Sequence, residues 1–465
     1  MANKRIYLCL AHMSEDGMEQ KYVKEAFDTN WVVPLGPNVN GFEKDLESFV
    51  SAIDNSQLTI DNSNLSAKRV VALSSGTAAV HLGLLACGVW PGDEVIVQSF
   101  TFCASTHPVT YLGATPVLVD SEPDTWNIDP ELLEVAIEDR IAKTGKKPKA
   151  IVPVALYGMP YKADRIMEIA NKYDIPVVED AAEGFGSKYK GQVLGTFGKY
   201  GVLSFNGNKM ITTSGGGALI TPDEDSWREI MMYATQYRES YPYYQHEKIG
   251  YNYRMSNICA GIGRGQMTIV NDHLAHHKHV QALYEELLAD VPGITVHSQP
   301  NDQWSMVNGQ SSMVYDSNYW LCTMTLDPEL KIKGQENAYK TLVTSAVGGA
   351  AGVIHVADSA TTDCQPNDNV EALRVFMDKA GIEARPVWKP MHKQPVYCRT
   401  NEKIAMNNEE LPCGAICQTS MTSVAYINGV SEAIFKVGMC LPAGPYVKDE
   451  DVRYIVDTIK NAIVG

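Results

Sequence analysis

The strongest constraint on the fold is a series of short apolar runs, rich in β-branched residues, that recur between about residue 70 and residue 221. Runs of this kind are typical of strands that are buried on both faces of a mostly parallel sheet. Helical patterns at residues 77–89 and 163–174 supply crossover connections between such strands. We therefore expect a doubly wound α/β domain with a seven-stranded sheet. The runs are residues 68–75, 93–99, 115–120, 150–156, 175–180, 198–205 and 217–221.

The remaining patterns indicate a second, smaller α/β domain. A long helical pattern at residues 261–291 leads from the sheet domain to a region with further strand and helix patterns. We expect residues 1–265 to form the large domain, with a helical segment at its N-terminus, and residues 266–465 to form the connecting helix and the small domain. Long stretches without regular patterns are uncommon in compact domains. Residues 344–368 and 398–423 are therefore expected to be insertions.

Charge and composition exclude several classes of function. The 39 basic and 55 acidic residues give a formal net charge of -16, which disfavours binding to nucleic acid or to anionic membranes. The sequence has no run of about 18 apolar residues that could span a membrane. The short apolar patch near the start ends at His12, which is unlike a secretory signal. Ten scattered cysteines favour reduced thiols, so we expect a soluble globular protein in the cytoplasm.

Three of the expected strands end in polar clusters, and ligands of α/β sheets bind beyond the carboxyl ends of the strands. In the first cluster, Gly76 permits a tight turn and Thr77 begins a helix. Because the first amides of a helix lack partners and the helix dipole favours negative charge, this turn is a candidate phosphate site. The same residues also fit an ordinary helix cap, and both interpretations stay open.

The second cluster contains Asp180, at the end of the run at residues 175–180. A carboxylate in this position can cap the turn that follows. It can also pair with a protonated ring nitrogen, which a pyridoxal cofactor needs in order to act as an electron sink. The position alone does not decide between these two roles.

The third cluster surrounds Lys209, in the glycine-dense stretch SFNGNKMITTSGGG at residues 204–217. The glycines allow a bulky ligand to approach the backbone. A lysine that is partly withdrawn from water can react through its amine form and make a Schiff base with an aldehyde. A phosphate turn, an acid for a ring nitrogen and a lysine, in this order, are much more specific together than separately.

With these motifs the chain resembles the DegT/DnrJ/EryC1/StrS family of pyridoxal-phosphate-dependent sugar aminotransferases. The resemblance continues through residues 29–46, 250–266, 385–397 and 441–447, and only the two unassigned stretches fall outside it. It implies a fold-type I, aspartate aminotransferase-like enzyme. It also implies the cofactor pyridoxal 5'-phosphate, which cycles through pyridoxamine 5'-phosphate.

The resemblance also assigns roles within the cofactor site. The motif SGTAAV gives Gly76 and Thr77 to the cofactor phosphate, which Ser204 also binds. The motif FTFCAS places Phe102 on a face of the pyridine ring, and EDAAE places Asp180 at the ring nitrogen.

Further roles follow from the same comparison of motifs. Glu183 is expected near the ring hydroxyl, and Lys209 is the residue that forms the Schiff base. Asn252 is expected to reach the phosphate of the neighbouring subunit's cofactor, so that activity requires a homodimer with shared active sites. Arg254 and His392 lie in motifs that the family brings to the mouth of the site, and we expect them to contact the substrate.

The implied reaction has two halves. An amino donor, which the resemblance implies is glutamate, leaves its amino group on the cofactor. That group then passes to a ketone of a nucleotide-linked 4-keto-6-deoxy sugar, and Lys209 moves the proton. The product would serve surface glycan or amino-sugar biosynthesis. A lyase, decarboxylase or dehydratase of the same fold is an alternative, although dehydratases of this family carry histidine at the position of Lys209. A cofactor-binding regulator is a second alternative, but no DNA-binding motif is apparent.

The chain departs from the family pattern at two places. The commonest family residue at the position of Glu183 is glutamine, and residues 214–217 read SGGG where the family often has GEGG.

No metal site is expected. His273, His276 and His277 share a helical face without an acidic or cysteine partner nearby, and we expect that face to be solvated. Cys413 and Cys417 lack further ligands close in the sequence.

Overall fold

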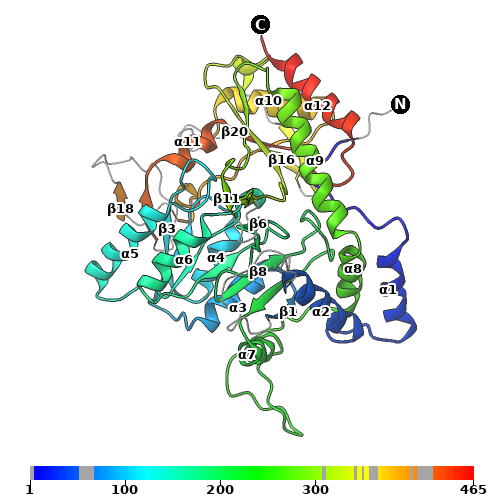
Figure 1. Ribbon diagram of the computed structural model, residues 1–465, viewed down its shortest axis with the longest axis vertical. Helices are drawn as coiled ribbons and strands as arrows, with labels where there is room; N and C mark the ends of the chain where they lie inside the picture. Colours follow the sequence, from blue (N-terminus) through cyan, green and yellow to red (C-terminus); the bar gives the residue numbers. More distant parts are fainter. Residues whose placement is uncertain are drawn as a thin grey trace.

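The computed structural model describes residues 5–51, 68–305, 311–339, 343–347, 350–354, 365–397, 402–405 and 423–464. Figure 1 shows a large body that contains β1, β8 and α3, a smaller body that contains α10, α12 and β20, and the long helix α9 that runs from one to the other. The helices are α1 (Met18–Asp28), α2 (Pro37–Ser51), α3 (Gly76–Ala86), α4 (His107–Tyr111), α5 (Pro130–Thr144), α6 (Ala163–Lys172), α7 (Glu224–Ala234), α8 (Asn257–Met267), α9 (Val270–Leu288), α10 (Asp368–Lys379), α11 (Val430–Val437) and α12 (Asp449–Ala462).

All seven predicted strands are present in the large body and form one sheet in the order β1-β9-β8-β5-β4-β2-β3. Parallel bridges between Ile151 and Val177 and between Val154 and Asp180 join the two halves of the sheet. Strand β9 is antiparallel to both of its neighbours, whereas the other pairs are parallel. The predicted doubly wound α/β architecture is confirmed. The strands are β1 (Arg69–Leu73), β2 (Glu94–Gln98), β3 (Thr115–Val119), β4 (Ala150–Val152), β5 (Val178–Asp180), β8 (Tyr200–Ser204) and β9 (Gly217–Thr221).

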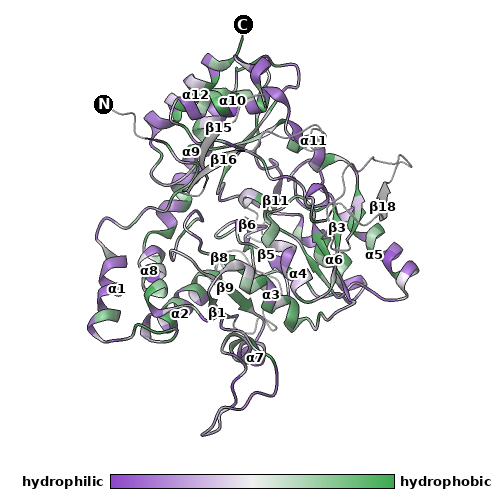
Figure 2. Ribbon diagram, turned by 180° about the vertical axis from the view of Figure 1, so that it is seen from behind, coloured by the Kyte–Doolittle hydropathy of each residue, from purple (hydrophilic) through white to green (hydrophobic). Residues whose placement is uncertain are grey.

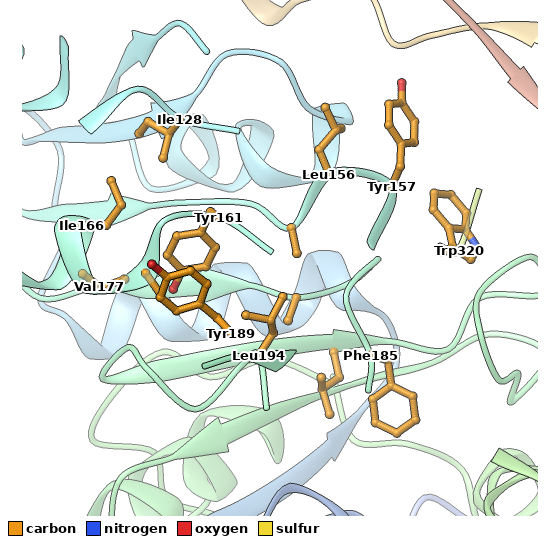
Figure 3. Close-up of a cluster of buried hydrophobic side chains, with 14 of the residues drawn as sticks. Ile128, Leu156, Tyr157, Tyr161, Ile166, Val177, Phe185, Tyr189, Leu194 and Trp320 are labelled. Carbon is orange, nitrogen blue, oxygen red and sulfur yellow. The ribbon is translucent and has the colours of Figure 1, made fainter. Parts of the chain in front are cut away.

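Both faces of this sheet are buried, which explains why its strands are apolar at nearly every position. In β1, Val70 and Ala72 belong to one hydrophobic cluster, and Val71 and Leu73 belong to another on the opposite face. Helices α2, α5, α6 and α8 contribute to the first cluster, and α3, α4 and α7 contribute to the second. Figure 3 shows part of the first cluster, and Figure 2 shows hydrophobic colouring over the strands of the large sheet.

The smaller body contains an antiparallel sheet in the order β10-β14-β20-β17. Helices α9, α10 and α12 cover it, because residues of all three share a hydrophobic cluster with its strands. Its strands are β10 (Ile294–Val296), β14 (Cys322–Leu326), β17 (Arg385–Pro386) and β20 (Gly438–Leu441). The loop that enters β14 ends with Trp320 and Leu321, so this body places a buried indole beside the large sheet domain.

Strand β19 (Val424–Ile427) was not expected in the large sheet. It pairs with β3 in parallel and lies at that edge of the sheet, although the predicted division assigns residues 266–465 to the small domain. All four residues of the strand are buried, so burial against α5 and β3 accounts for its position. The division between residues 265 and 266 itself stays a prediction.

The two unassigned stretches contain short strands where the structure describes them. Strands β15 (Val343–Val347) and β16 (Ala350–Ile354) form an antiparallel hairpin, and β18 (Glu402–Ala405) pairs with β19. Cys413 and Cys417 lie outside the described residues. The other short strands are β6 (Lys188–Tyr189), β7 (Gln192–Val193), β11 (Gln303–Ser305), β12 (Ser311–Met313) and β13 (Tyr315–Asp316).

The histidine face of α9 differs from the prediction. His273 and His277 are buried rather than solvated. Their Nδ1 atoms lie 3.1 Å and 3.0 Å from the carbonyl oxygens of Met210 and Tyr319, and these hydrogen-bond partners offset the cost of burying the rings. Within the described ranges, no group of three or more histidine, cysteine, aspartate or glutamate side chains could hold a metal ion. In the same part of the chain, no helix is both long enough and apolar enough to cross a bilayer.

Candidate active site

The turn between β1 and α3 forms one wall of a cavity at the carboxyl ends of the large sheet. Ser75 caps α3, and its hydroxyl accepts a hydrogen bond from the amide of Ala78 at 3.0 Å. The first residues of α3, Gly76 and Thr77, therefore present amides at the helix N-terminus, where anions bind favourably. A side chain at Gly76 would come within 2.9 Å of the Cβ atom of Ser204, so only glycine lets these two segments approach.

Asp180 lies at the end of β5 and is almost fully buried. One carboxylate oxygen accepts a hydrogen bond from the Ser105 hydroxyl at 2.7 Å, and the other accepts one from the Ala182 amide at 3.1 Å. Burial raises the pKa of Asp180 above its ordinary value, and these hydrogen bonds only partly oppose that effect. These two hydrogen bonds hold the carboxylate in one orientation.

Lys209 follows β8 and turns back into the same cavity. Its Nζ atom lies 3.3 Å from Oε1 of Glu183 and 3.9 Å from the ring centre of Trp320. The other oxygen of Glu183 accepts the amide hydrogen of Tyr157 at 2.8 Å. Burial raises the pKa of Glu183, and the nearby Lys209 opposes that shift. Lysine and carboxylate therefore form a largely enclosed pair whose side chains are 13% and 5% exposed.

These segments enclose a cavity of about 330 Å³. Seven of the predicted site residues line it together, although they come from four separate parts of the chain. They are Gly76, Thr77, Phe102, Asp180, Glu183, Ser204 and Lys209. Phe102 is 52% exposed at the rim, with its ring centre 6.0 Å from that of Trp388.

The structure does not bring the other three predicted residues into this cavity. Asn252 is exposed and forms a bridge with Thr235. Arg254 forms a buried ion pair with Glu43. His392 is buried, with its ring nitrogens 2.7 Å from the Ser99 hydroxyl and 2.9 Å from the Glu432 carboxylate. The predicted roles of these three residues stay predictions.

Several side chains of the cavity wall were not singled out from the sequence, among them Ser105, Trp320 and Trp388. Ser105 orients Asp180, and its only signal was a hydroxyl in the motif FTFCAS. Trp320 and Trp388 also line the cavity. Trp320 ends the stretch DSNYW and Trp388 ends the stretch RPVW, both far from Lys209 in the sequence, and no local pattern marks such residues as neighbours of a lysine.

The chain is similar to known proteins of one family. The model of the DegT/DnrJ/EryC1/StrS aminotransferase family matches residues 13–334. EpsN of Bacillus subtilis (strain 168), a proposed pyridoxal phosphate-dependent aminotransferase, is 36% identical over 98% of this chain and 95% of its own length. GDP-perosamine synthase of Caulobacter vibrioides is 32% identical over 90% of this chain and 92% of its own length.

The fold agrees with that of solved structures. A crystal structure of a DegT DnrJ EryC1 StrS aminotransferase from Brucella abortus superposes with a TM-score of 0.71 at 24% identity, covering 96% of this chain and 95% of that one. The chain belongs to the DegT/DnrJ/EryC1/StrS aminotransferase family. It is a fold-type I, pyridoxal-phosphate-dependent aminotransferase, as the resemblance predicted.

The cavity fits this cofactor by the chemistry of its walls. An aromatic aldehyde that carries a phosphate, a basic ring nitrogen and a phenolic oxygen needs an anion seat, an acid and an amine at separate points. The turn at Gly76, the Asp180 carboxylate and the Lys209 amine supply these groups around one cavity.

Proposed function

We propose that this protein transfers an amino group from glutamate to the keto group of a nucleotide-linked 4-keto-6-deoxy sugar. The observation that carries the proposal is that Lys209, Asp180 and the turn at Gly76 line one cavity of about 330 Å³ in a chain of this aminotransferase family. The sugar nucleotide is supported by the name of the relative GDP-perosamine synthase, which places a nucleoside diphosphate on its product. The product would enter surface glycan or amino-sugar biosynthesis.

In this proposal the residues of the cavity have separate roles. The amides of Gly76 and Thr77 and the hydroxyl of Ser204 bind the phosphate. When bound, the cofactor supplies an electron sink that stabilises negative charge at the carbon next to the transferred nitrogen. Asp180 would hold a proton on the ring nitrogen. Lys209 Nζ would carry the covalent bond to the cofactor and, once released, would move a proton between the substrate carbon that bears the nitrogen and the adjoining carbon of the cofactor.

Two further residues adjust the ring in this proposal. Phe102 packs on a face of the pyridine. The Glu183 carboxyl lies beside the phenolic oxygen, where two negative oxygens would repel each other. Because burial raises the pKa of Glu183, its carboxyl retains a proton more readily, and sharing that proton removes the repulsion.

A homodimer with shared sites is part of the proposal. Asn252 lies outside its own cavity and is exposed, as a residue that serves a neighbouring cofactor must be. The segment between α7 and α8 projects away from the large body (Figure 1), and its residues Tyr243, Tyr244 and Ile249 are strongly exposed. Exposed apolar groups of this kind mark protein interfaces. Mixing Asn252→Ala with Lys209→Ala subunits is expected to restore part of the activity; no restoration despite proven subunit exchange would contradict a shared site.

Substrate contacts of Arg254 and His392 are included as predictions from the family motifs. Both side chains have protein partners, so a role in substrate binding requires that the mouth of the site rearranges or that a second subunit completes it. A cytoplasmic location is also proposed, and it is supported by the six free cysteines among the described residues. Cell fractionation with detection of the protein tests that location.

Incubating the holoenzyme with glutamate alone tests the function. An aminotransferase converts its bound cofactor to the pyridoxamine form and releases 2-oxoglutarate, which absorbance and product analysis detect. A panel of keto-sugar nucleotides is then expected to consume that form. A dehydratase would instead release ammonia only when the sugar is present, and a lyase would cleave the amino acid. Failure of the whole panel with an intact cofactor would overturn the sugar substrate.

A further inference from the structure

Trp320 makes an unusual contact for a buried tryptophan. Its side chain is about 1% exposed and is part of the large hydrophobic cluster, at one end of the group drawn in Figure 3. Yet the ring centre lies 3.9 Å from the Nζ atom of Lys209. An ammonium group over an indole face is attracted by the ring quadrupole, and tryptophan provides the strongest such attraction among the aromatic side chains.

The indole is fixed by hydrogen bonds rather than by packing alone. Its Nε1 donates to the carbonyl of Asn208 at 2.6 Å, and its backbone amide donates to Oδ1 of Asn318 at 2.8 Å. The amide group of Asn318 in turn donates to the carbonyl of Glu183 at 2.9 Å. Asn318 therefore ties the indole to the backbone of the residue whose carboxylate contacts Lys209.

The Glu183 carboxylate and the Trp320 ring together form a binding site for an ammonium group, which we call the seat. The Glu183 carboxylate lies 3.3 Å from Nζ, and the Trp320 face lies on a second side. Both groups attract an ammonium group. A lysine that acts in transamination must leave the cofactor and later return, so it needs a defined position in between.

We propose that Trp320 is a positioning residue that, together with Glu183, holds the Lys209 ammonium group whenever Lys209 is not bonded to the cofactor. The inference rests on the role of Lys209 in the proposed function. Trp320 enters the site from the loop before β14, so the seat is built by both bodies of the molecule. Without this indole face, the released side chain loses an attraction that keeps it beside the reacting atoms.

Displacement of Lys209 by methylamine tests the seat without measuring turnover. In the holoenzyme, the C=N bond to Nζ is exchanged for a C=N bond to the methylamine nitrogen, and the protons that methylamine gives up pass to Nζ. The exchange is redox neutral. Absorbance titration at fixed pH gives the methylamine concentration that releases half of the lysine.

In Trp320→Leu the released state loses its cation–π contact. The half-release concentration is therefore expected to rise by about 2- to 30-fold, the range that a cation–π contact supplies. Trp320→Phe keeps a weaker aromatic face and is expected to show a smaller rise. This order of the three proteins separates a cation–π seat from a role in packing alone.

Trp227→Leu is the matched control. Trp227 also donates its Nε1 to a backbone carbonyl, that of Val70 at 3.1 Å, and a cation, the guanidinium of Arg69, also lies over its ring at 4.5 Å. It does not line the cavity, so its half-release concentration is expected to equal that of the wild type.

The outcomes separate this inference from the proposed function. Borohydride reduction followed by peptide mapping shows whether the cofactor is attached to Lys209; attachment elsewhere would overturn the function's lysine. If Lys209 is confirmed and folded Trp320→Leu and Trp320→Phe release it at the wild-type concentration, the seat is overturned alone. If Trp320→Leu does not fold, Trp320→Phe decides: a rise supports the seat, and no rise overturns it.

Discussion

The carboxylates of the cofactor cavity differ from those in the ion pairs outside it in how far neighbouring groups offset the effect of burial on their pKa. In the cavity, burial raises the pKa values of Asp180 and Glu183. Outside it, burial alone would raise the pKa of Glu432, but hydrogen bonds from His392 and Lys393 outweigh that effect and lower the value to about 2. The cavity carboxylates lack full compensation, whereas the outer carboxylate is matched by its neighbours.

This difference indicates what each region does. A carboxylate without full compensation gains when a cationic group arrives, which suits Asp180 to a protonated ring nitrogen. In a pair such as Arg254 with Glu43, whose side chains are 8% and 9% exposed, each charge already has its partner within the protein. Buried charge therefore separates a binding site from a structural pair only when its partners are considered.

Glu179 shows that a raised pKa alone does not identify a site. It precedes Asp180 on β5 and is completely buried. Its Oε2 accepts amide hydrogens from Phe197 at 3.0 Å and Gly198 at 3.4 Å, and burial raises its pKa to about 7. It does not line the cavity. Glu179 and Asp180 are thus adjacent carboxylates on opposite faces of one strand, and only Asp180 lines the cavity. The same substitution at each position therefore tests whether activity depends on lining the cavity rather than on burial.

The largest effect is expected for Asp180→Asn. The amide cannot balance the charge of a protonated ring nitrogen, so kcat is expected to fall by about 10³-fold, measured in the glutamate half-reaction. The covalent bond to Lys209 remains, so the visible absorbance is retained. Glu179→Gln makes the same chemical change one residue earlier and is expected to keep kcat within about twofold. Equal losses in both variants would break the distinction between the two carboxylates.

A structural effect is expected for Arg254→Met. The change leaves Glu43 buried without its cation, so the free energy of unfolding in urea is expected to fall by about 3 kcal/mol. Adding Glu43→Gln removes the stranded charge and is expected to recover part of the loss. A fall below about 1 kcal/mol would contradict a structural pair. A raised KM for the sugar nucleotide, measured well below the unfolding temperature, would show that Arg254 also contacts substrate, as the family motif predicts.

The large sheet could be predicted because its strands are buried on both faces, which leaves apolar runs that are visible locally. Strand β19 carries an equally apolar run, but it lies after β18 and far from β3 in the sequence. No local sequence pattern indicates whether such a strand joins the large sheet or the sheet of the smaller body. The prediction that the face of α9 with His273 is solvated was wrong for a related reason. The hydrogen-bond partner of the His273 ring is a backbone carbonyl, that of Met210, which is distant in the sequence.

The cavity could be predicted because its motifs follow strands that end at the same edge of one sheet. That geometry brings Gly76, Asp180 and Lys209 together whatever the connecting loops do. Trp320 depends instead on how the smaller body packs against the larger one, which the sequence does not display. Likewise, the family motif predicts His392 at the mouth of the site but does not reveal its carboxylate partner, Glu432.

The smallest effect is expected in the pH dependence of stability. The pKa of Glu179 is raised in the folded protein from 4.5 to about 7, so the folded state binds this proton more tightly than the unfolded state. The contribution of Glu179 to stability is therefore fully present below pH 4.5 and is lost as the pH rises toward 7, by about 2 kcal/mol between pH 5 and pH 7. Glu179→Gln does not titrate, so its free energy of unfolding is expected to lack this fall. Urea unfolding of both proteins across that range measures the difference. Parallel curves would mean that the amides of Phe197 and Gly198 already compensate the charge, and Glu179 would then belong with the matched carboxylates outside the cavity.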